Sequence, residues 1–566
     1  MKNTYNTVFL ILLFAINGFS QQFSASYSSD VLDEPFTGNV IVYMSKENKT
    51  PKNEHIGFNV FPVFSVAVKN IHPGQAIIID DKATSYPTTL SNIERGVYYV
   101  QIVWDRNLGG RSIAQSPGNL YNNAEIVHIT KNTNETFKIV ATQIIPPVQA
   151  FQESEFIKEI KVPSSLLSTF HGKPMTINAA VILPKEYDEN PSRTFPVLFT
   201  VSGYGGDYHR LSGHNNPSHP LGSIPIIEVY LDGNCSLGHS VYANSDNNGP
   251  WGDALTTEFI PYLEKQYKCN GVKLLTGHSS GGWTVLWLQT QYPKVFDACW
   301  SSSPDPVDFR NFTSINLYED KNMFYDANGS LRSVATVGGF IPWTTMKKFY
   351  QMENVVYRGE QMHSFNAVFS KRGDDGLPLE ICNHETGEIN PIVIEHWKKY
   401  DIALYLRNNW EDIKPDLDGK VRVSVGDQDN FHLNHPVYLL EAQMKELNSS
   451  FQFAYYPGDH FTVHTPEYKD EGYQFLENYY LETVAKQGQH YQKHKDYNSL
   501  NKVVELMPLE ADTSYVKSVL GTPIDMGFDY RYLIDSTGVN GCVIGAVFHL
   551  NDNGKIDQKW VGEICE

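Results

Sequence analysis

The chain has few basic residues, no long apolar run and no regular cysteine spacing. It has 45 Lys and Arg compared with 64 Asp and Glu, and the resulting net charge of −19 repels phosphate backbones and anionic lipid surfaces. Nucleic-acid binding is therefore not expected. The one stretch of membrane character, Val8–Ile16, has nine residues, too few to span a hydrocarbon core of about 30 Å. No membrane span is expected, and the six Cys match no zinc-binding spacing, so neither a metal nor another cofactor is expected.

The first 20 residues are typical of a signal peptide, with Lys2 before the apolar run and a cleavage site near Ser20. We therefore expect a secreted or periplasmic protein. Cysteines of an exported chain can pair, although six of them allow 15 connectivities and the sequence does not choose among these. Cys542 and Cys565, close together near the C-terminus, are the pair we expect.

A length of 566 residues predicts three to four domains at roughly 150 residues each, or fewer if one is large. Residues 21–150 consist of short alternating runs such as "GNVIVYMS" and "GVYYVQIVWD", with no helical period. This pattern predicts an all-β, immunoglobulin-like antiparallel sandwich. Such a domain could bind glycan or shield the next domain, and we favour the structural role because fold alone does not imply function.

Residues 156–487 alternate apolar strands, such as "PVLFTVSG" and "VKLLTG", with helices expected over 254–266, 280–291, 436–447 and 467–485. Near-continuous apolar strands joined by helices predict a doubly wound, mostly parallel sheet covered on both faces.

An insertion at about 304–418 interrupts this alternation. Insertions of that size commonly cover a site, so we expect its aromatic side chains to line a pocket, among them Trp343, Tyr350, Phe365 and Trp397. Residues 488–566 are interpreted as a polar linker followed by a small α+β module.

The segment Gly277-His278-Ser279-Ser280-Gly281 stands between a predicted strand and a predicted helix. A nucleophile on such a sharp turn is strained, and the residues two before and two after it must be small. Both positions are glycine here. The motif predicts Ser279 as a nucleophile.

A serine hydroxyl needs a base to take its proton, and the motif predicts a carboxylate and then a histidine further along the chain. His460 follows the last predicted strand of the sheet and is the expected base. The expected acid is Asp429 or Asp427, both in the turn after the preceding strand. The neighbouring His432 and His464 are interpreted as polar loop residues.

Two backbone N–H groups are expected to stabilise the oxyanion of a tetrahedral intermediate. One belongs to Ser280, at the start of the helix after the nucleophile. The other belongs to the glycine-rich loop after "PVLFTV", with Tyr204 as the donor and Gly203 allowing the backbone to approach closely.

The ordered phrases "FPVLFTVSGYGG", "GPWGDALTTEFIPYLEKQY" and "VKLLTGHSSGGWTVLWLQTQYPKVFDACWSSSP" resemble the esterase family that includes esterase D, feruloyl esterases, enterochelin esterases and the mycolyltransferases. The resemblance covers about residues 157–485 and implies an α/β-hydrolase fold with Ser279, Asp429 and His460 as triad. The family usually has His-Gly where this chain has Ser202-Gly203, and its interval before the acid is shorter.

The resemblance implies an exported serine esterase acting through an acyl-enzyme, with carbohydrate-linked or siderophore-type esters among its substrates. Its partner would be a small-molecule or glycan-linked ester. Two alternatives stay open: a serine peptidase or acyltransferase on the same fold, and a non-catalytic glycan-binding protein. A prolyl-oligopeptidase arrangement would need a propeller with more strands than about 120 residues can supply.

Overall fold

The computed structural model describes residues 21–130, 135–189 and 193–565. The chain divides into two compact units, residues 1–147 and 148–566, and each is described by itself. The predicted signal peptide lies outside the described residues. No helix of the described ranges is long and apolar enough to cross a membrane.

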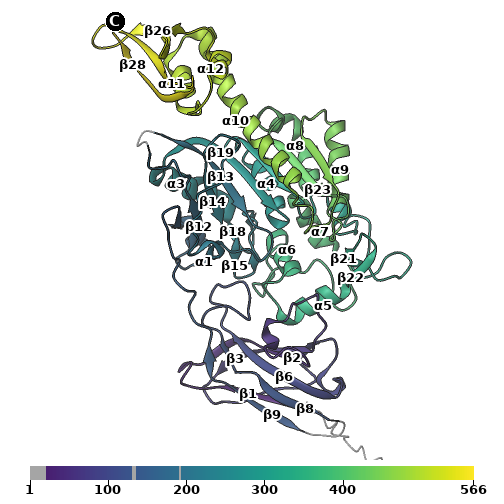
Figure 1. Ribbon diagram of the computed structural model, residues 1–566. Helices are drawn as coiled ribbons and strands as arrows, with labels where there is room; N and C mark the ends of the chain where they lie inside the picture. Colours follow the sequence, from purple (N-terminus) through teal and green to yellow (C-terminus); the bar gives the residue numbers. More distant parts are fainter. Residues whose placement is uncertain (1–20, 131–134, 190–192, 566) are drawn as a thin grey trace, which may run out of the picture. The chain divides into compact units, whose positions relative to one another are not determined.

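The first unit contains two β-sheets (Figure 1). One sheet has the order β4-β1-β9, with bounds Ile77–Ile79, Gln22–Tyr27 and Thr136–Ala141. The other has the order β10-β7-β6-β2-β3-β5, with β8 also on β6; its strands are β2 (Phe36–Ser45), β3 (Val63–Ile71), β5 (Thr84–Tyr86), β6 (Gly96–Asp105), β7 (Leu120–Tyr121), β8 (Glu125–Ile129) and β10 (Gln143–Ile144). Side chains of both sheets, including Tyr27 and Trp104, share one core.

The larger sheet of this unit is antiparallel, as expected, but β1 and β9 pair in parallel. The prediction of a purely antiparallel sandwich is therefore wrong at this pair. Parallel neighbours need a long connection between them. Here nearly the whole unit separates the two strands, because β1 begins it and β9 lies near its end.

The second unit is built on an eight-stranded sheet with the order β11-β12-β14-β13-β19-β20-β23-β24. Its strands are β11 (Ile157–Pro163), β12 (Thr176–Ile182), β13 (Phe195–Val201), β14 (Ile227–Leu231), β19 (Cys269–His278), β20 (Ala298–Ser302), β23 (Val421–Gly426) and β24 (Gln452–Tyr456). β11, β12 and β14 pair antiparallel, and all pairs from β14 to β24 are parallel. The prediction of a mostly parallel sheet is confirmed. β11 is a strand that the sequence analysis did not assign.

Helices lie where the sequence pattern predicts them, and apart from the longer C-terminal helix α10 their bounds agree to within a few residues. α4 is Ser280–Gln291 and α9 is Asn434–Glu446. The helix expected over 254–266 is α2 (Trp251–Ala254), a π-helical turn and α3 (Ile260–Gln266). Every residue of α4 from Ser280 to Thr290 is buried, which explains its lack of a polar face.

The interval between β20 and β23 contains a hairpin and four longer helices. Its elements are β21 (Ser333–Val337), β22 (Ile341–Thr345), α5 (Met346–Val356), α6 (Gln361–Phe369), α7 (Pro391–Trp397) and α8 (Ile402–Leu417). α8 packs against α4 and α9, so it belongs to the helices that cover the sheet. The insertion proper therefore ends near residue 401, earlier than the predicted 418.

The predicted linker at residue 488 is wrong, because α10 (Pro466–His494) runs through it and α11 (Tyr497–Leu506) follows almost at once. Val484, Gly488 and Tyr491 form a buried stripe on α10, and α12 (Thr513–Leu520) packs on it. A side chain at Gly488 would collide with the Val519 carbonyl oxygen. The polar remainder of the helix surface is what made this segment resemble a linker.

A four-stranded antiparallel sheet completes the C-terminal part, which the sequence analysis interpreted only as a small α+β module. Its order is β25 (Ile524–Asp525), β26 (Asp529–Thr537), β27 (Val543–Leu550) and β28 (Ile556–Ile564). Figure 1 shows α10 reaching from the large sheet to this small one, and one core joins them. The Cys542–Cys565 disulfide is present, confirming the expected pair, while Cys235, Cys269, Cys299 and Cys382 are free thiols.

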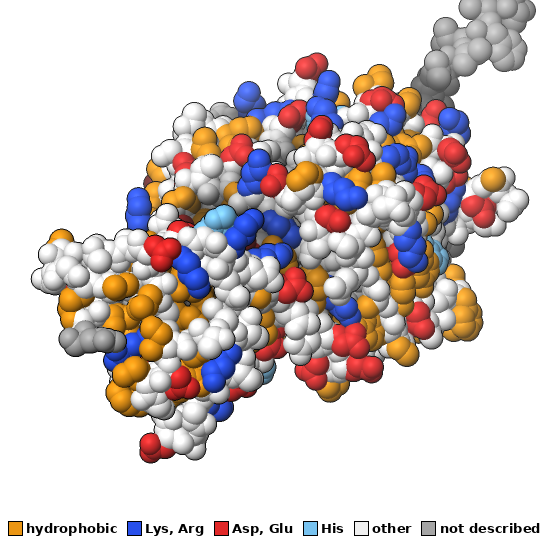
Figure 2. Space-filling view, turned by 90° about the horizontal axis from the view of Figure 1, so that it is seen from above, with side chains coloured by type: hydrophobic (Ala, Val, Ile, Leu, Met, Phe, Trp, Pro, Cys, Tyr) orange, Lys and Arg blue, Asp and Glu red, His pale blue; other side chains and the backbone are white. Residues whose placement is uncertain are grey.

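On the face drawn in Figure 2, acidic and basic side chains are interspersed. The excess of acidic residues is therefore not gathered there into one patch.

Candidate active site

Ser279 lies on the turn between β19 and α4, in a backbone conformation that residues other than glycine rarely adopt (φ 59°, ψ −125°). A side chain at Gly277 would collide with the Gly281 carbonyl oxygen, and one at Gly281 with the Val201 carbonyl oxygen. The glycines that flank the serine are therefore required by packing. The turn raises Ser279 out of the sheet at the carboxyl ends of its parallel strands, where open α/β sheets place their sites.

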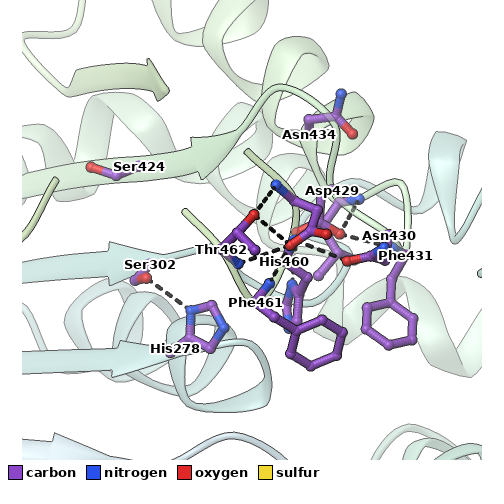
Figure 3. A network of polar contacts seen from close by, with 12 residues as sticks. His278, Ser302, Ser424, Asp429, Asn430, Phe431, Asn434, His460, Phe461 and Thr462 are labelled. Atoms are coloured by element: carbon purple, nitrogen blue, oxygen red, sulfur yellow. Dashed lines mark hydrogen bonds and ion pairs between the residues drawn. The ribbon is translucent and has the colours of Figure 1, made fainter. Parts of the chain in front are cut away.

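His460 follows β24 and is 3% exposed. Its Nδ1 lies 2.7 Å from Oδ2 of Asp429, which follows the neighbouring strand β23 (Figure 3). The other carboxylate oxygen, Oδ1, accepts the Phe431 N–H at 2.9 Å, and the His460 N–H donates to the Asn430 side chain at 3.1 Å. The histidine and the carboxylate are thus held together by both the side chains and the backbone of their turns.

Asp427, the alternative acid, points elsewhere. It is exposed, and its Oδ1 accepts the Gly458 N–H at 3.2 Å. The structure therefore brings Asp429, and not Asp427, to His460.

The loop after β13 passes directly against the nucleophile turn. A Cβ at Gly203 would lie 3.2 Å from the Ser279 Cβ and 3.3 Å from the His278 carbonyl oxygen. The Tyr204 hydroxyl donates to the Gly359 carbonyl oxygen at 2.7 Å and to the Glu360 carboxylate at 3.1 Å, which ties this loop to the insertion. The Ser280 N–H belongs to the first turn of α4, whose N–H groups have no partner within the helix.

His278 packs on the ring of His460, a contact the sequence analysis missed. The ring centroids are 4.5 Å apart, and the ring centroid of His464 lies 4.3 Å from that of His278. The His278 Nδ1 is 2.9 Å from the Ser302 Oγ (Figure 3). Burial lowers the pKa of His278 to about 2, and the charges of the neighbouring His460 and His464 contribute to a smaller extent. His278 is therefore neutral, and its uncharged ring packs beside the ring of His460.

Asp305 is a further carboxylate of the site that the sequence analysis missed. It comes just after β20, the strand beside β19, and its Oδ2 accepts the Ser280 hydroxyl at 2.6 Å. Its place after a parallel strand next to the nucleophile strand was the available signal.

The aromatic residues expected to line a pocket are mostly core residues of the insertion. Tyr350 and Trp397 are 0% exposed and Phe365 is 7% exposed. Phe365 and Trp397 pack on Phe312 and Phe369, and Phe369 packs on Trp283 of α4. The prediction that they line the site is therefore wrong for Tyr350 and Trp397, because large apolar rings are better stabilised by packing on one another.

Besides its contacts with Tyr204, the insertion reaches the site at Asn430 and at Ser280. Thr336 of β21 and Asn430 exchange two hydrogen bonds of 2.8 and 2.9 Å, one residue from Asp429. The Gln361 side chain lies 3.5 Å from the Ser280 Oγ. Phe431 and the exposed Phe461 flank the His460 ring with centroids 5.0 and 5.4 Å away, so the approach to His460 is apolar (Figure 3).

A strained serine between strand and helix, on a mostly parallel eight-stranded sheet, defines the α/β-hydrolase class. A family profile described as "Putative esterase" matches residues 171–473, more than half of the chain. The chain belongs to this esterase family.

Solved structures with similar folds include a ferulic acid esterase (17% identity, covering 58% of this chain and 98% of that one, TM-score 0.34). Others are an S-formylglutathione hydrolase from Agrobacterium tumefaciens (13% identity, 58% and 96% covered, TM-score 0.34) and an IroE-like serine hydrolase from Shewanella oneidensis (12% identity, 62% and 97% covered, TM-score 0.30). At such identities the similarity concerns the fold alone. No curated protein sequence matches the chain.

Proposed function

We propose that the protein is an exported serine hydrolase that cleaves carboxylic esters, with Ser279 as nucleophile, His460 as base and Asp429 as orienting acid. The observation that carries this proposal is the buried 2.7 Å pair of His460 and Asp429 at the same edge of the sheet as the strained Ser279. The family match agrees with the type of bond cleaved.

In the proposed mechanism, Nε2 of His460 takes the proton from the Ser279 hydroxyl as its oxygen attacks the ester carbonyl carbon. Asp429 accepts the Nδ1–H and stabilises the imidazolium that forms. The oxyanion is stabilised by the N–H groups of Ser280 and Tyr204. Tyr204 lies on the loop after β13, which approaches Ser279 closely at Gly203. The alcohol leaves with the proton from His460, and a water activated by the same histidine then releases the acid.

Carbohydrate-linked or siderophore-type esters are the proposed natural substrates, on the basis of the family resemblance. Export rests on the N-terminal sequence, and the Cys542–Cys565 disulfide is the kind of bond that persists in oxidising compartments. For the N-terminal β-sheet unit we propose a structural role.

The test is an activity panel on p-nitrophenyl esters of short acids, feruloyl and acetylated sugars, and a peptide p-nitroanilide. The Ser279→Ala and His460→Ala variants are compared with Ser518→Ala, an exposed serine on α12 far along the chain. Each site variant should lose at least about 10³-fold in kcat, and the double variant should be little worse, because triad members act as a unit. Retention of more than a few per cent by Ser279→Ala would remove it from the mechanism.

A further inference from the structure

Asp305 lies against the nucleophile turn. Its backbone N–H donates to the Ser279 carbonyl oxygen at 3.2 Å, and its carboxylate accepts the Ser280 hydroxyl at 2.6 Å. Asp305 is 7% exposed and Ser280 is 2% exposed. The Ser279 hydroxyl is also near enough to hydrogen-bond the same carboxylate and so lower its pKa.

The charge of this carboxylate has little compensation. Among the described residues, no Lys or Arg forms an ion pair with Asp305, and its carboxylate accepts a hydrogen bond from the neutral Ser280 hydroxyl. The ionisable groups that act on it are His460, which can carry a positive charge, and Asp429, which is negative and already paired with His460. Burial raises the pKa of Asp305 to about 6, so the group is ionised at pH 8.

The negative charge of Asp305 acts on the acyl group of the substrate. In the acyl-enzyme the acyl carbon is bonded to the Ser279 oxygen, so a charge two to four bonds from the carbonyl is held near Asp305. Coulomb interaction between such groups in a site shielded from water is large compared with thermal energy. The negative charge also opposes the oxyanion, but it does so for every ester alike.

We propose that Asp305 is a specificity-determining residue, selecting esters whose acyl group is neutral or positively charged near the carbonyl and rejecting acyl groups that carry a carboxylate there. This inference rests on the proposed function and narrows its substrate class.

The experiment uses three p-nitrophenyl esters that differ only at the end of the acyl chain: the butyrate, the β-alaninate and the monosuccinate. They place a methyl, an ammonium and a carboxylate at the same position. For each enzyme kcat/KM is measured at pH 8 with all three, and the ratio of the β-alaninate to the monosuccinate is taken. A ratio within one preparation does not depend on the fraction of folded enzyme.

The wild type should prefer the β-alaninate to the monosuccinate, and Asp305→Asn, which can still accept the Ser280 hydroxyl, should lower that ratio by at least about tenfold. The matched control is Asp401→Asn in the insertion. Asp401 is also buried, and burial raises its pKa to about 6. Its carboxylate, however, accepts hydrogen bonds from the Tyr318 hydroxyl and from the N–H groups of Phe309 and Leu404. Its ratio should match that of the wild type.

A second measurement lowers the pH to 5.5. Asp305 should then be largely protonated, whereas the succinyl carboxylate, with an ordinary pKa of about 4.3, stays ionised. The wild-type ratio should therefore fall toward that of Asp305→Asn. A ratio unaffected by Asp305→Asn would overturn the inference and leave the proposed function standing, whereas a wild type inactive on all three esters would overturn both.

Discussion

Replacing Asp429 by Asn should inactivate the enzyme through the wrong tautomer of His460. In the wild type, Oδ2 of Asp429 lies 2.7 Å from Nδ1 of His460, while Oδ1 accepts the Phe431 N–H at 2.9 Å. In Asp429→Asn the Phe431 N–H needs an acceptor, so it holds the amide oxygen on its own side. The amide NH₂ then faces Nδ1, which must become an acceptor, and the ring proton moves to Nε2.

A histidine protonated at Nε2 cannot take the proton of Ser279. The expected loss in kcat is about 10⁴-fold, the size seen for this change in a well-studied triad, or about 5 kcal/mol in the activation barrier. Asp427→Asn is the matched control, because it lies in the same turn and its partner is the Gly458 N–H, which an amide oxygen can still accept. It should change kcat less than about threefold.

Both variants are assayed by p-nitrophenyl acetate hydrolysis at pH 8, with thermal unfolding measured in parallel to show that each is folded. A folded Asp429→Asn that keeps more than about a tenth of the activity would refute the tautomer argument. An inactive Asp427→Asn would show that the acid is in the other position of the turn.

Three further predictions concern stability. Gly281→Ala should destabilise the fold by at least about 2 kcal/mol, because the new methyl collides with the carbonyl oxygens of Val201 and Ser202 at the end of β13. Gly562→Ala, whose Cβ would meet nothing closer than 3.9 Å, should cost less than about 1 kcal/mol in the same urea titration. Burial lowers the pKa of His363 to about 4, so stability should be lost as the pH falls below 6.5, and between pH 7 and pH 5 His363→Leu should lose about 2 kcal/mol less than the wild type. Equal losses would contradict this burial effect. The Cys542–Cys565 disulfide closes a loop with a sequence separation of 23 residues. Cys542→Ser should therefore lower the free energy of unfolding by about 3 kcal/mol, measured as a lower denaturation midpoint of the C-terminal sheet.

Much of the catalytic fold could be predicted from the sequence because its signals are local. The strands of the parallel sheet are rich in apolar residues, as in Phe195–Val201, and every residue of Val421–Gly426 is buried, because both faces of the sheet are covered. The nucleophile turn needs glycine two residues before and two residues after Ser279, and both glycines lie within the same five-residue segment of the chain. The predicted bounds of α4 agree with the structure for the same reason.

The predictions failed where a segment depends on a distant partner. Residues 486–494 are polar in composition, and only the packing of α12 on Val484, Gly488 and Tyr491 shows that they continue a helix. The aromatic residues of the insertion, such as Trp397, bury themselves against rings elsewhere in the chain. Composition alone does not distinguish a ring that lines a pocket from one that packs in a core.

The sequence alone predicted a serine, a histidine and one of two aspartates at the carboxyl edge of a parallel sheet. Only the tertiary structure decided which aspartate faces His460, because Asp427 and Asp429 share one turn and their directions depend on how β23 and β24 pair. It also brought His278 onto the His460 ring and Asp305 to Ser280. These contacts join residues from different strand ends, and the pairing of the strands sets their distances.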